Sequence, residues 1–180
     1  MTPLRRRTDL ERTDNSSETP PPGRVAHADS PQLPEWAERV LLTAPVAYVG
    51  MVDQDGPYVV PVSFTYASGE ILFHGGPGKK SQALERDPRV CIAVTAEAAF
   101  VRGKSACQDT FHYRSILIFG EARRLTAPSD AARALRLIVE KYEAAGAEAR
   151  FEGPTLARTW VHAARIQTFS CKIEPSPEGG

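Results

Sequence analysis

The feature that most constrains this 180-residue chain is a series of short apolar segments joined by tight turn signals. VAYVGMVD and YVVPVSFTY flank QDGP, in which Asp-Gly favours a hairpin turn. ASGE then turns the chain into ILFHG, and apolar segments of the same kind follow. Consecutive hairpins pair their strands antiparallel, and Pro61 inside the second segment favours either a position at the sheet edge or a bulge. The sequence therefore predicts a mainly β (α+β) fold.

Three helical patterns accompany these strands. Trp36, Val40 and Leu41 share one face of a helix after Pro34, and SQALERD makes a short helix that stops before Pro88. The third and clearest helical pattern is SDAARALRLIVEKYEAAG, and Ser129 is suited to cap this helix. The C-terminal TWVHAARIQTFSCKIEP has strand composition and returns to the sheet. We expect an antiparallel barrel with helices at its edges.

Composition divides the chain into three parts. Residues 1–30 are polar and proline-rich, which predicts a mobile N-terminal arm; residues 31–175 form the barrel domain, and residues 176–180 a disordered tail. The formal net charge is zero, which disfavours nucleic acid as a partner, and no apolar run is long enough to span a membrane. Three scattered cysteines without a CxxC pair favour the reducing cytoplasm.

The segment FHGGPGKKSQAL, residues 73–84, is a candidate anion site. Its three glycines permit close backbone approach, and Lys79 and Lys80 stand at the start of a helix, where unpaired amides favour an anion. Two ammonium groups suit a phosphate monoester of about two negative charges. The segment does not match the GxxxxGK[ST] pattern of nucleotide-binding loops. A solvated basic turn is an equally good interpretation of the residues alone.

A second candidate lies in FVRGKSACQDTFHYRSILIFGEAR, residues 100–123. His112, Tyr113, Arg114 and Ser115 crowd polar groups against the first turn of a very apolar strand. Such groups can bind a planar ligand rich in heteroatoms, with the strand as a wall. The alternative is that they cover an exposed strand end. Cys107, His112 and His74 fit no standard metal-ligand spacing, so no metal site is expected.

The order PYVVPVSF, FHG, DPRVCIAV and YRSILIFG over residues 34–173 resembles the flavin-binding split-barrel group related to pyridoxamine 5′-phosphate oxidase. The nearest branch is similar to the nitroimidazole-resistance flavoproteins. The resemblance implies a six-stranded antiparallel split β-barrel with peripheral helices. It also implies an FMN cofactor, a homodimer with sites at its interface, and reduction of a small organic substrate such as a nitroaromatic compound.

The resemblance also implies roles for individual residues. The phosphate would be held after the FHG strand, the flavin ring would lie along the VVPVSF strand, and YRS would contribute across the dimer interface. His74 and Tyr113 are the candidates for proton donation to the substrate. The predicted cofactor-binding residues are Val60, Val62, Ser63, His74, Lys79, Lys80, Ser81, Tyr113, Arg114 and Ser115.

Departures from the family pattern leave alternatives. SACQDTFHYRS replaces a histidine-rich loop of related flavoproteins, which bears on the substrate more than on the cofactor. The substrate signature of a true pyridoxamine 5′-phosphate oxidase is not evident. The same barrel would also serve a non-catalytic flavin or haem carrier, or a reductase that uses the deazaflavin F420.

Overall fold

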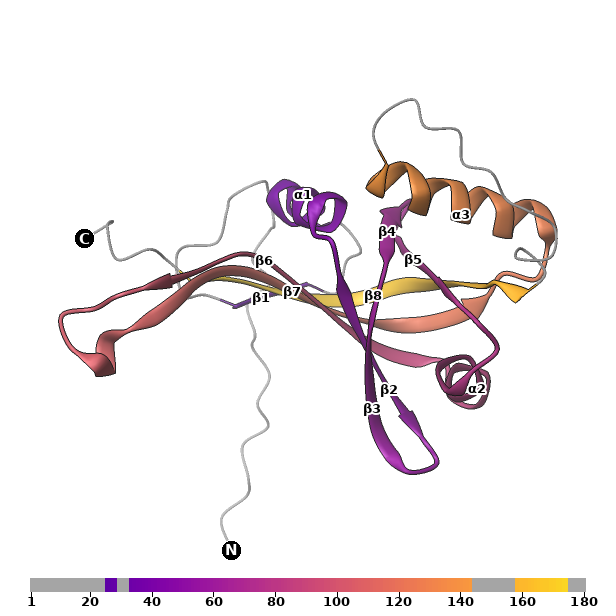
Figure 1. The fold of residues 1–180 in the computed structure, drawn as a ribbon, viewed down its shortest axis with the longest axis horizontal. Coiled ribbons are helices and arrows are strands. Elements are labelled where there is room, and N and C mark those ends of the chain that lie inside the picture. Colours follow the sequence, from indigo (N-terminus) through magenta and orange to yellow (C-terminus); the bar gives the residue numbers. More distant parts are fainter. Residues whose placement is uncertain (1–24, 29–32, 144–157, 175–180) are drawn as a thin grey trace, which may run out of the picture.

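The structure, a computed structural model, describes residues 25–28, 33–143 and 158–174. Its elements are arranged as an antiparallel sheet with three helices (Figure 1). The strands are β1 (Val25–Ala28), β2 (Ala47–Asp53), β3 (Gly56–Val62), β4 (Phe64–Ala67), β5 (Glu70–Gly75), β6 (Arg89–Val101), β7 (Thr110–Arg124) and β8 (Trp160–Glu174). The helices are α1 (Glu35–Thr43), α2 (Lys79–Arg86) and α3 (Pro128–Tyr142).

The sheet order explains how the barrel closes. The strands follow the path β3-β2-β6-β7-β8-β5-β4, so β3 and β4 lie at opposite edges. Only Ser63 separates these two strands along the chain. The two edges must therefore approach each other at Ser63, which curls the sheet into a split barrel. The predicted fold class is confirmed, and Pro61 lies on an edge strand as predicted.

Over the residues that the structure describes, the sheet has eight strands instead of the expected six. Ser63 divides the predicted YVVPVSFTY segment into β3 and β4. In addition, residues 25–28 of the predicted N-terminal arm form β1, which pairs with β8 from Phe169 to Lys172. That stretch of β8 lies beyond the residues paired with β5, so β1 satisfies an edge that would otherwise be open. The rest of the predicted arm and the tail at 176–180 lie outside the described residues.

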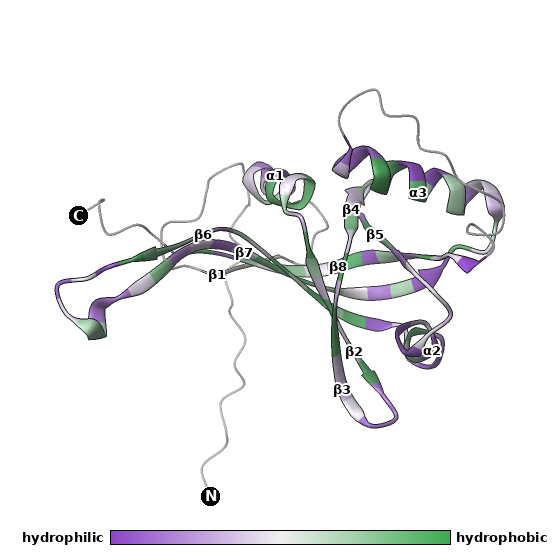
Figure 2. Ribbon diagram, viewed as in Figure 1, coloured by the Kyte–Doolittle hydropathy of each residue, from purple (hydrophilic) through white to green (hydrophobic). Residues whose placement is uncertain are grey.

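The barrel interior is a continuous apolar core, and the helices close it. Phe64, Phe73 and Ile118 are fully buried there, and α1 contributes Trp36 and Leu41. Helix α3 covers the other side of β5 and β8 through a second apolar cluster. Figure 2 shows that α2 and the turn between β2 and β3 are largely hydrophilic. This polar end of the barrel contains the predicted anion site.

Helix α3 begins two residues earlier than a Ser129 cap would place it. Ala127 is the N-cap and Pro128 occupies the first turn, while no side chain caps the helix. Proline suits this position because its fixed φ is helical and the missing N–H would be unpaired there in any case. Within the described residues, no helix combines the length and hydropathy needed to cross a bilayer.

Strands β6 and β7 continue beyond the barrel as a projecting hairpin (Figure 1). We call residues 97–112 the hairpin arm. A bulge between Ala96 and Ala99 marks its base, where Glu97 adopts a positive φ of 55°. A short 3-10 turn, Ala106–Gln108, lies near its tip. The arm contributes Phe100 and Phe111, which are both more than half exposed.

Candidate functional site

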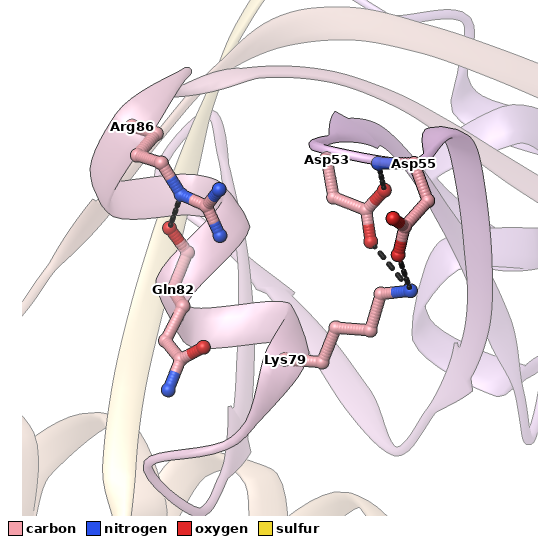
Figure 3. Close-up of polar contacts among 5 residues, drawn as sticks. All are labelled: Asp53, Asp55, Lys79, Gln82 and Arg86. Atoms are coloured by element: carbon pink, nitrogen blue, oxygen red, sulfur yellow. Dashed lines mark hydrogen bonds and ion pairs between the residues drawn. The ribbon is translucent and has the colours of Figure 1, made fainter.

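The two adjacent lysines at the start of α2 point to different partners. The Lys79 ammonium lies 2.7 Å from Asp53 Oδ2 and 3.1 Å from Asp55 Oδ2, in the turn between β2 and β3 (Figure 3). The hydrogen bond from Lys79 lowers the pKa of Asp53, and the same contact raises the pKa of Lys79. The Lys79 charge is therefore already balanced, and this lysine ties α2 to the hairpin turn.

Lys80 instead lies against the end of β5. Its Nζ donates to the His74 carbonyl oxygen at 2.8 Å and sits 5.3 Å from the centre of the Phe73 ring. The close approach depends on Gly75, because a Cβ there would lie 2.7 Å from the Lys80 Nζ. Burial lowers the pKa of Lys80, and none of the described carboxylates forms an ion pair with it. An anion beside this ammonium would supply the charge that the protein does not.

Ser81 has a structural role in place of the predicted phosphate contact. It is fully buried, and its hydroxyl donates to the Gly76 carbonyl oxygen at 2.9 Å. This bond, together with Gly78 N–H donating to the same carbonyl at 2.9 Å, fixes the glycine turn before α2. Sequence reasoning could not separate a buried serine from a ligand contact, because both favour a small hydroxyl side chain.

The glycine turn has room for an anion. A Cβ at Gly76 or Gly78 would meet no atom within 4 Å, so the space above the turn is open. The first amides of a helix lack partners within the helix, and its dipole favours negative charge there. Lys80 and the start of α2 thus fit a phosphate group, with Lys79 held aside by its carboxylates.

His74 lies at the end of β5, on the side opposite Phe73. It is exposed, whereas its neighbour Phe73 is fully buried in the barrel. Partial burial of the ring, followed by the nearby Lys80 charge, lowers the pKa of His74. The imidazole is therefore neutral near pH 7 and can accept a proton only under more acidic conditions than an ordinary histidine.

Strand β3 presents a different set of side chains from the predicted one. Val62 is buried in the core, and Val60 is partly buried and packs against it. Val59 and Pro61 alternate with them and are exposed, as is Ser63 at the junction with β4. Because alternate strand residues face opposite sides, Val60 and Val62 can offer a ligand only their main chain. The outward wall consists of Val59, Pro61 and Ser63.

The Tyr113-Arg114-Ser115 segment is divided between two faces of β7. Arg114 lies 3.0 Å from Glu97 Oε2 and 5.9 Å from the Trp36 ring, on the barrel side. Tyr113 and Ser115 alternate with it and follow the same face as the exposed Leu117 and Phe119. Only Tyr113 and Ser115 can meet a ligand on the outer surface.

Lys172, which the sequence did not single out, positions Tyr113. Its Nζ donates to the Tyr113 hydroxyl oxygen at 2.9 Å and lies 2.7 Å from Glu174 Oε2. The hydrogen bond from Lys172 to Glu174 raises the pKa of Lys172, so this cation is retained. Because the ammonium donates to the phenol oxygen, the hydroxyl proton is directed toward another acceptor.

The predicted residues lie at opposite ends of the molecule. Along β8, Val161 pairs with His74 while Glu174 pairs with Tyr113. At ~3.3 Å per residue this separation is about 40 Å along the strand. Lys80 and His74 therefore lie at one end of β8, and Tyr113 lies at the other. The outer wall of β3 lies between them, because its residues Val59 and Pro61 share rows of the sheet with Phe119 and Leu117 of β7. One chain cannot bring both groups to the same small ligand.

His162 is a further polar group near Lys80. It is 1% exposed and stacks on Phe73 with ring centres 5.4 Å apart, and neither of its nitrogens has a hydrogen-bond partner. Burial, with smaller effects of Lys80 and Arg124, lowers its pKa to about 4. The sequence did not single out His162, because a histidine within a strand gives no sign of lacking partners.

The outward side of the sheet carries large apolar side chains. Strand β2 alternates between buried residues, such as Val49, and exposed Tyr48 and Val52. Pairing places these beside exposed residues of the neighbouring strands, and we call this surface the outer face. Its exposed apolar residues are Tyr48, Val52, Val59, Leu117 and Phe119.

Comparison with known proteins identifies the family and the fold. A family model described as pyridoxamine 5′-phosphate oxidase matches residues 34–173. The FAD and haem binding protein from Mycobacterium smegmatis is 25% identical, with a TM-score of 0.72 over 86% of this chain and 76% of that chain. The flavocytochrome Anf3 from Azotobacter vinelandii is 23% identical, with a TM-score of 0.71 over 84% and 70%.

A third solved structure comes from the branch that the sequence resembles. It is a candidate 5-nitroimidazole antibiotic resistance protein from Bacteroides thetaiotaomicron, 23% identical, with a TM-score of 0.68 over 82% of this chain and 87% of that chain. No curated protein matches the chain. At these identities the flavocytochrome and the resistance protein show a shared fold and nothing finer.

Proposed function

The chain belongs to the pyridoxamine 5′-phosphate oxidase family, and on that premise we propose that it is a homodimeric flavoprotein that binds FMN and reduces a small organic substrate. The proposal includes nitroaromatic compounds among the substrates, because the sequence resembles the nitroimidazole-resistance branch. The free cysteines Cys91, Cys107 and Cys171 support a reducing cytoplasm as its location.

The observation that carries the proposal is the arrangement around Lys80. A half-buried ammonium without a described carboxylate partner, an open glycine turn and the start of a helix converge at one point. Each feature favours an anion, and together they suit the phosphate of a cofactor. Lys79 is the outer boundary of this site and not its principal cation.

The outer wall of β3 suits the rest of the cofactor. Tyr58, on the core side of β3 with Val60, lies 5.0 Å from the Lys79 ammonium, so this end of β3 is close to the start of α2. Ser63 is five residues farther along the chain, about 17 Å at ~3.4 Å per residue. An elongated phosphorylated cofactor could lie from the glycine turn along Val59 and Pro61 toward Ser63. When bound, FMN would supply hydride or electron transfer. The Tyr113 hydroxyl, held by Lys172, is the proposed proton donor, with His74 as the alternative.

The outer face supports the homodimer. Tyr48 and Val59 are 51% and 60% exposed, and they extend an apolar surface across β2 and β3 toward Leu117 and Phe119 on β7. Contiguous apolar surface of this kind marks an interaction site, and twofold pairing of identical chains is the commonest way to bury it. A dimer would also supply Tyr113 and Ser115 from a second chain to the Lys80 end.

The proposal can be tested on the purified protein. Its visible spectrum should show flavin bands, alone or after incubation with FMN, and native mass spectrometry should give a dimer with two FMN molecules. A colourless protein that does not take up FMN would refute the flavoprotein assignment. Turnover of a nitroaromatic compound with a nicotinamide donor would then test the oxidoreductase activity separately.

A second candidate is a flavin or haem carrier without catalytic activity. The neighbour named as an FAD and haem binding protein has the highest TM-score of the three reported, which supports this alternative. A haem absorption band, or bound flavin that no donor reduces, would favour it. The deazaflavin F420 would be recognised by a longer-wavelength absorption band and strong fluorescence.

A further inference from the structure

The hairpin arm carries an aromatic pair that the barrel does not bury. Phe100 and Phe111 pair across β6 and β7, with ring centres 5.6 Å apart in an edge-to-face arrangement. They are 54% and 56% exposed. A two-stranded ribbon is only marginally stable by itself. Two half-exposed phenylalanines on such a ribbon form an apolar surface that favours contact with another surface.

The bulge at the base of the arm determines which way Phe100 points. Before the bulge, Cys91 and Ala93 pair with Phe119 and Leu117 of the outer face. One extra residue in β6 between Ala96 and Ala99 then reverses the alternation. As a result Phe100 pairs with Phe111 on the face that also carries Tyr113 and Leu117. The aromatic pair therefore extends the outer face, the surface already assigned to the dimer.

Charge distinguishes the two ends of this surface. The arm tip carries Arg102 and Lys104 against one carboxylate, Asp109, which accepts from the Gly103 amide at 2.9 Å, so the tip has a net positive charge. At the other end of β6, the turn between β2 and β3 carries Asp53 and Asp55. The Asp55 side chain is 83% exposed, so it can accept a second cation besides Lys79.

Two chains stacked through the outer face are related by a twofold axis that lies in the interface. If the axis runs along the strands, the two basic arm tips lie side by side and repel each other. If the axis runs across the strands, each basic tip lies over the acidic turn of the other chain. Opposite charges favour the second arrangement.

We propose that each hairpin arm embraces a second copy of this chain, with Phe100 and Phe111 packed on its outer face and the basic tip beside its Asp55 turn. The inference rests on the proposed dimer and specifies its geometry. It also brings Tyr113 and Ser115 of one copy toward the Lys80 end of the other. The separation along β8 described above is then the reason why the site needs two chains.

Cysteine cross-linking tests the arrangement directly, because Cys107 is exposed near the arm tip. The full-length Asp55→Cys variant should form a covalent dimer under mild oxidation, and the additional Cys107→Ser substitution should abolish it. A Glu140→Cys variant, exposed on α3, is the matched control and should remain uncrosslinked. A covalent dimer of the unsubstituted chain formed through Cys107 would place the arm tips together and overturn the proposal.

Dimer dissociation measured by analytical ultracentrifugation provides a second test. Phe100→Ser with Phe111→Ser should raise the dimer Kd at least about tenfold, since buried aromatic anchors dominate interfaces. Leu42→Ser, which removes an apolar residue on α1 that is 50% exposed, should leave it unchanged. Arg102→Glu with Lys104→Glu should also weaken the dimer, and Asp55→Arg in the same chain should restore it.

These measurements distinguish the arm contact from dimerisation itself. A monomeric chain would refute both the arm proposal and the dimer of the proposed function. A dimer whose Kd is unchanged by all of the arm substitutions would refute the arm proposal alone. FMN binding and dimerisation would not be affected by that result. Tighter association of the Arg102→Glu, Lys104→Glu variant would show that the basic tips meet, against the proposal.

Discussion

The two ends of the long strands have opposite characters. At the α2 end, Lys80 and His162 are drawn into the protein, and burial lowers the pKa of both. At the arm end, Phe100 and Phe111 are more than half exposed, with Tyr113 on the same face. One end has polar groups without enough partners, and the other has apolar groups without a covering surface. In a dimer, the arm end of one copy could lie beside the α2 end of the other.

The difference also explains why a compact ligand site is hard to find in a single chain. Residues that the family resemblance assigns to one cofactor lie about 40 Å apart along β8, at ~3.3 Å per residue. The core between the two ends is packed with side chains such as Phe64 and Ile118. A ligand therefore cannot reach both groups through the barrel, and only the outer surface remains.

The largest expected effect is a loss of stability in acid, caused by the buried His162 at the α2 end. The pKa of His162 is lowered from its ordinary value of 6.5 to about 4. Between these two pH values the unfolded chain binds a proton at His162 that the native state does not bind. This contribution is complete above pH 6.5 and is lost as the pH falls toward 4, by about 3 kcal/mol. Urea unfolding at pH 7 and pH 4.5 measures it.

His162→Leu should remove most of this loss, because leucine does not titrate. The matched control is His74→Leu at the exposed neighbouring position, where the decline with acid should change less. If His162→Leu declines as steeply as the unsubstituted chain, the α2 end is not the acid-sensitive region, and the contrast between the ends is weaker than described.

The two lysines should contribute unequally to FMN binding. Lys80→Ala removes the half-buried cation of the glycine turn, and we expect FMN affinity to fall about 10- to 100-fold, as for other charged hydrogen bonds. Lys79→Ala should change it less than about threefold, because Asp53 and Asp55 already balance that charge. Fluorescence titration with FMN compares the two. Equal losses would mean that Lys79 leaves its carboxylates when the cofactor binds.

The smallest effect concerns the junction between β3 and β4. The Tyr142 hydroxyl donates to the Pro45 carbonyl oxygen at 2.7 Å and accepts from the Phe64 amide at 3.0 Å, beside Ser63. Tyr142→Phe should cost about 1 kcal/mol in the free energy of unfolding, the value of a typical hydrogen bond. Denaturant unfolding measures it. A stability unchanged within error would show that β4 holds the barrel edges together without α3.

The sequence predicted the fold well because the relevant signals are local. Hairpin turns and alternation identified the antiparallel strands, and Pro61 indicated an edge. The division of the segment at Ser63 was missed, since it depends on where the two sheet edges meet. Strand β1 was missed because four residues in a polar arm carry too little pattern of their own.

The candidate site was predicted less completely, for a physical reason. Sequence order placed Lys79 and Lys80 together, but only the fold shows that Asp53 and Asp55 reach the first of them. Likewise, Val60 and Val62 match the family strand, yet the alternation of side chains turns them into the core. The partners of a charge and the side of a strand depend on contacts distant in sequence.

The central claim is that one site uses the Lys80 end of one chain and the Tyr113 end of another. Chains carrying Lys80→Ala, and chains carrying Tyr113→Ala with Ser115→Ala, should each bind FMN poorly as homodimers. Mixed and reassociated in equal amounts, they should recover about one quarter of the normal sites, because half of the random dimers contain one intact site. The FMN bound per chain measures this recovery. No recovery in heterodimers verified by native mass spectrometry would place each site within a single chain and contradict the account.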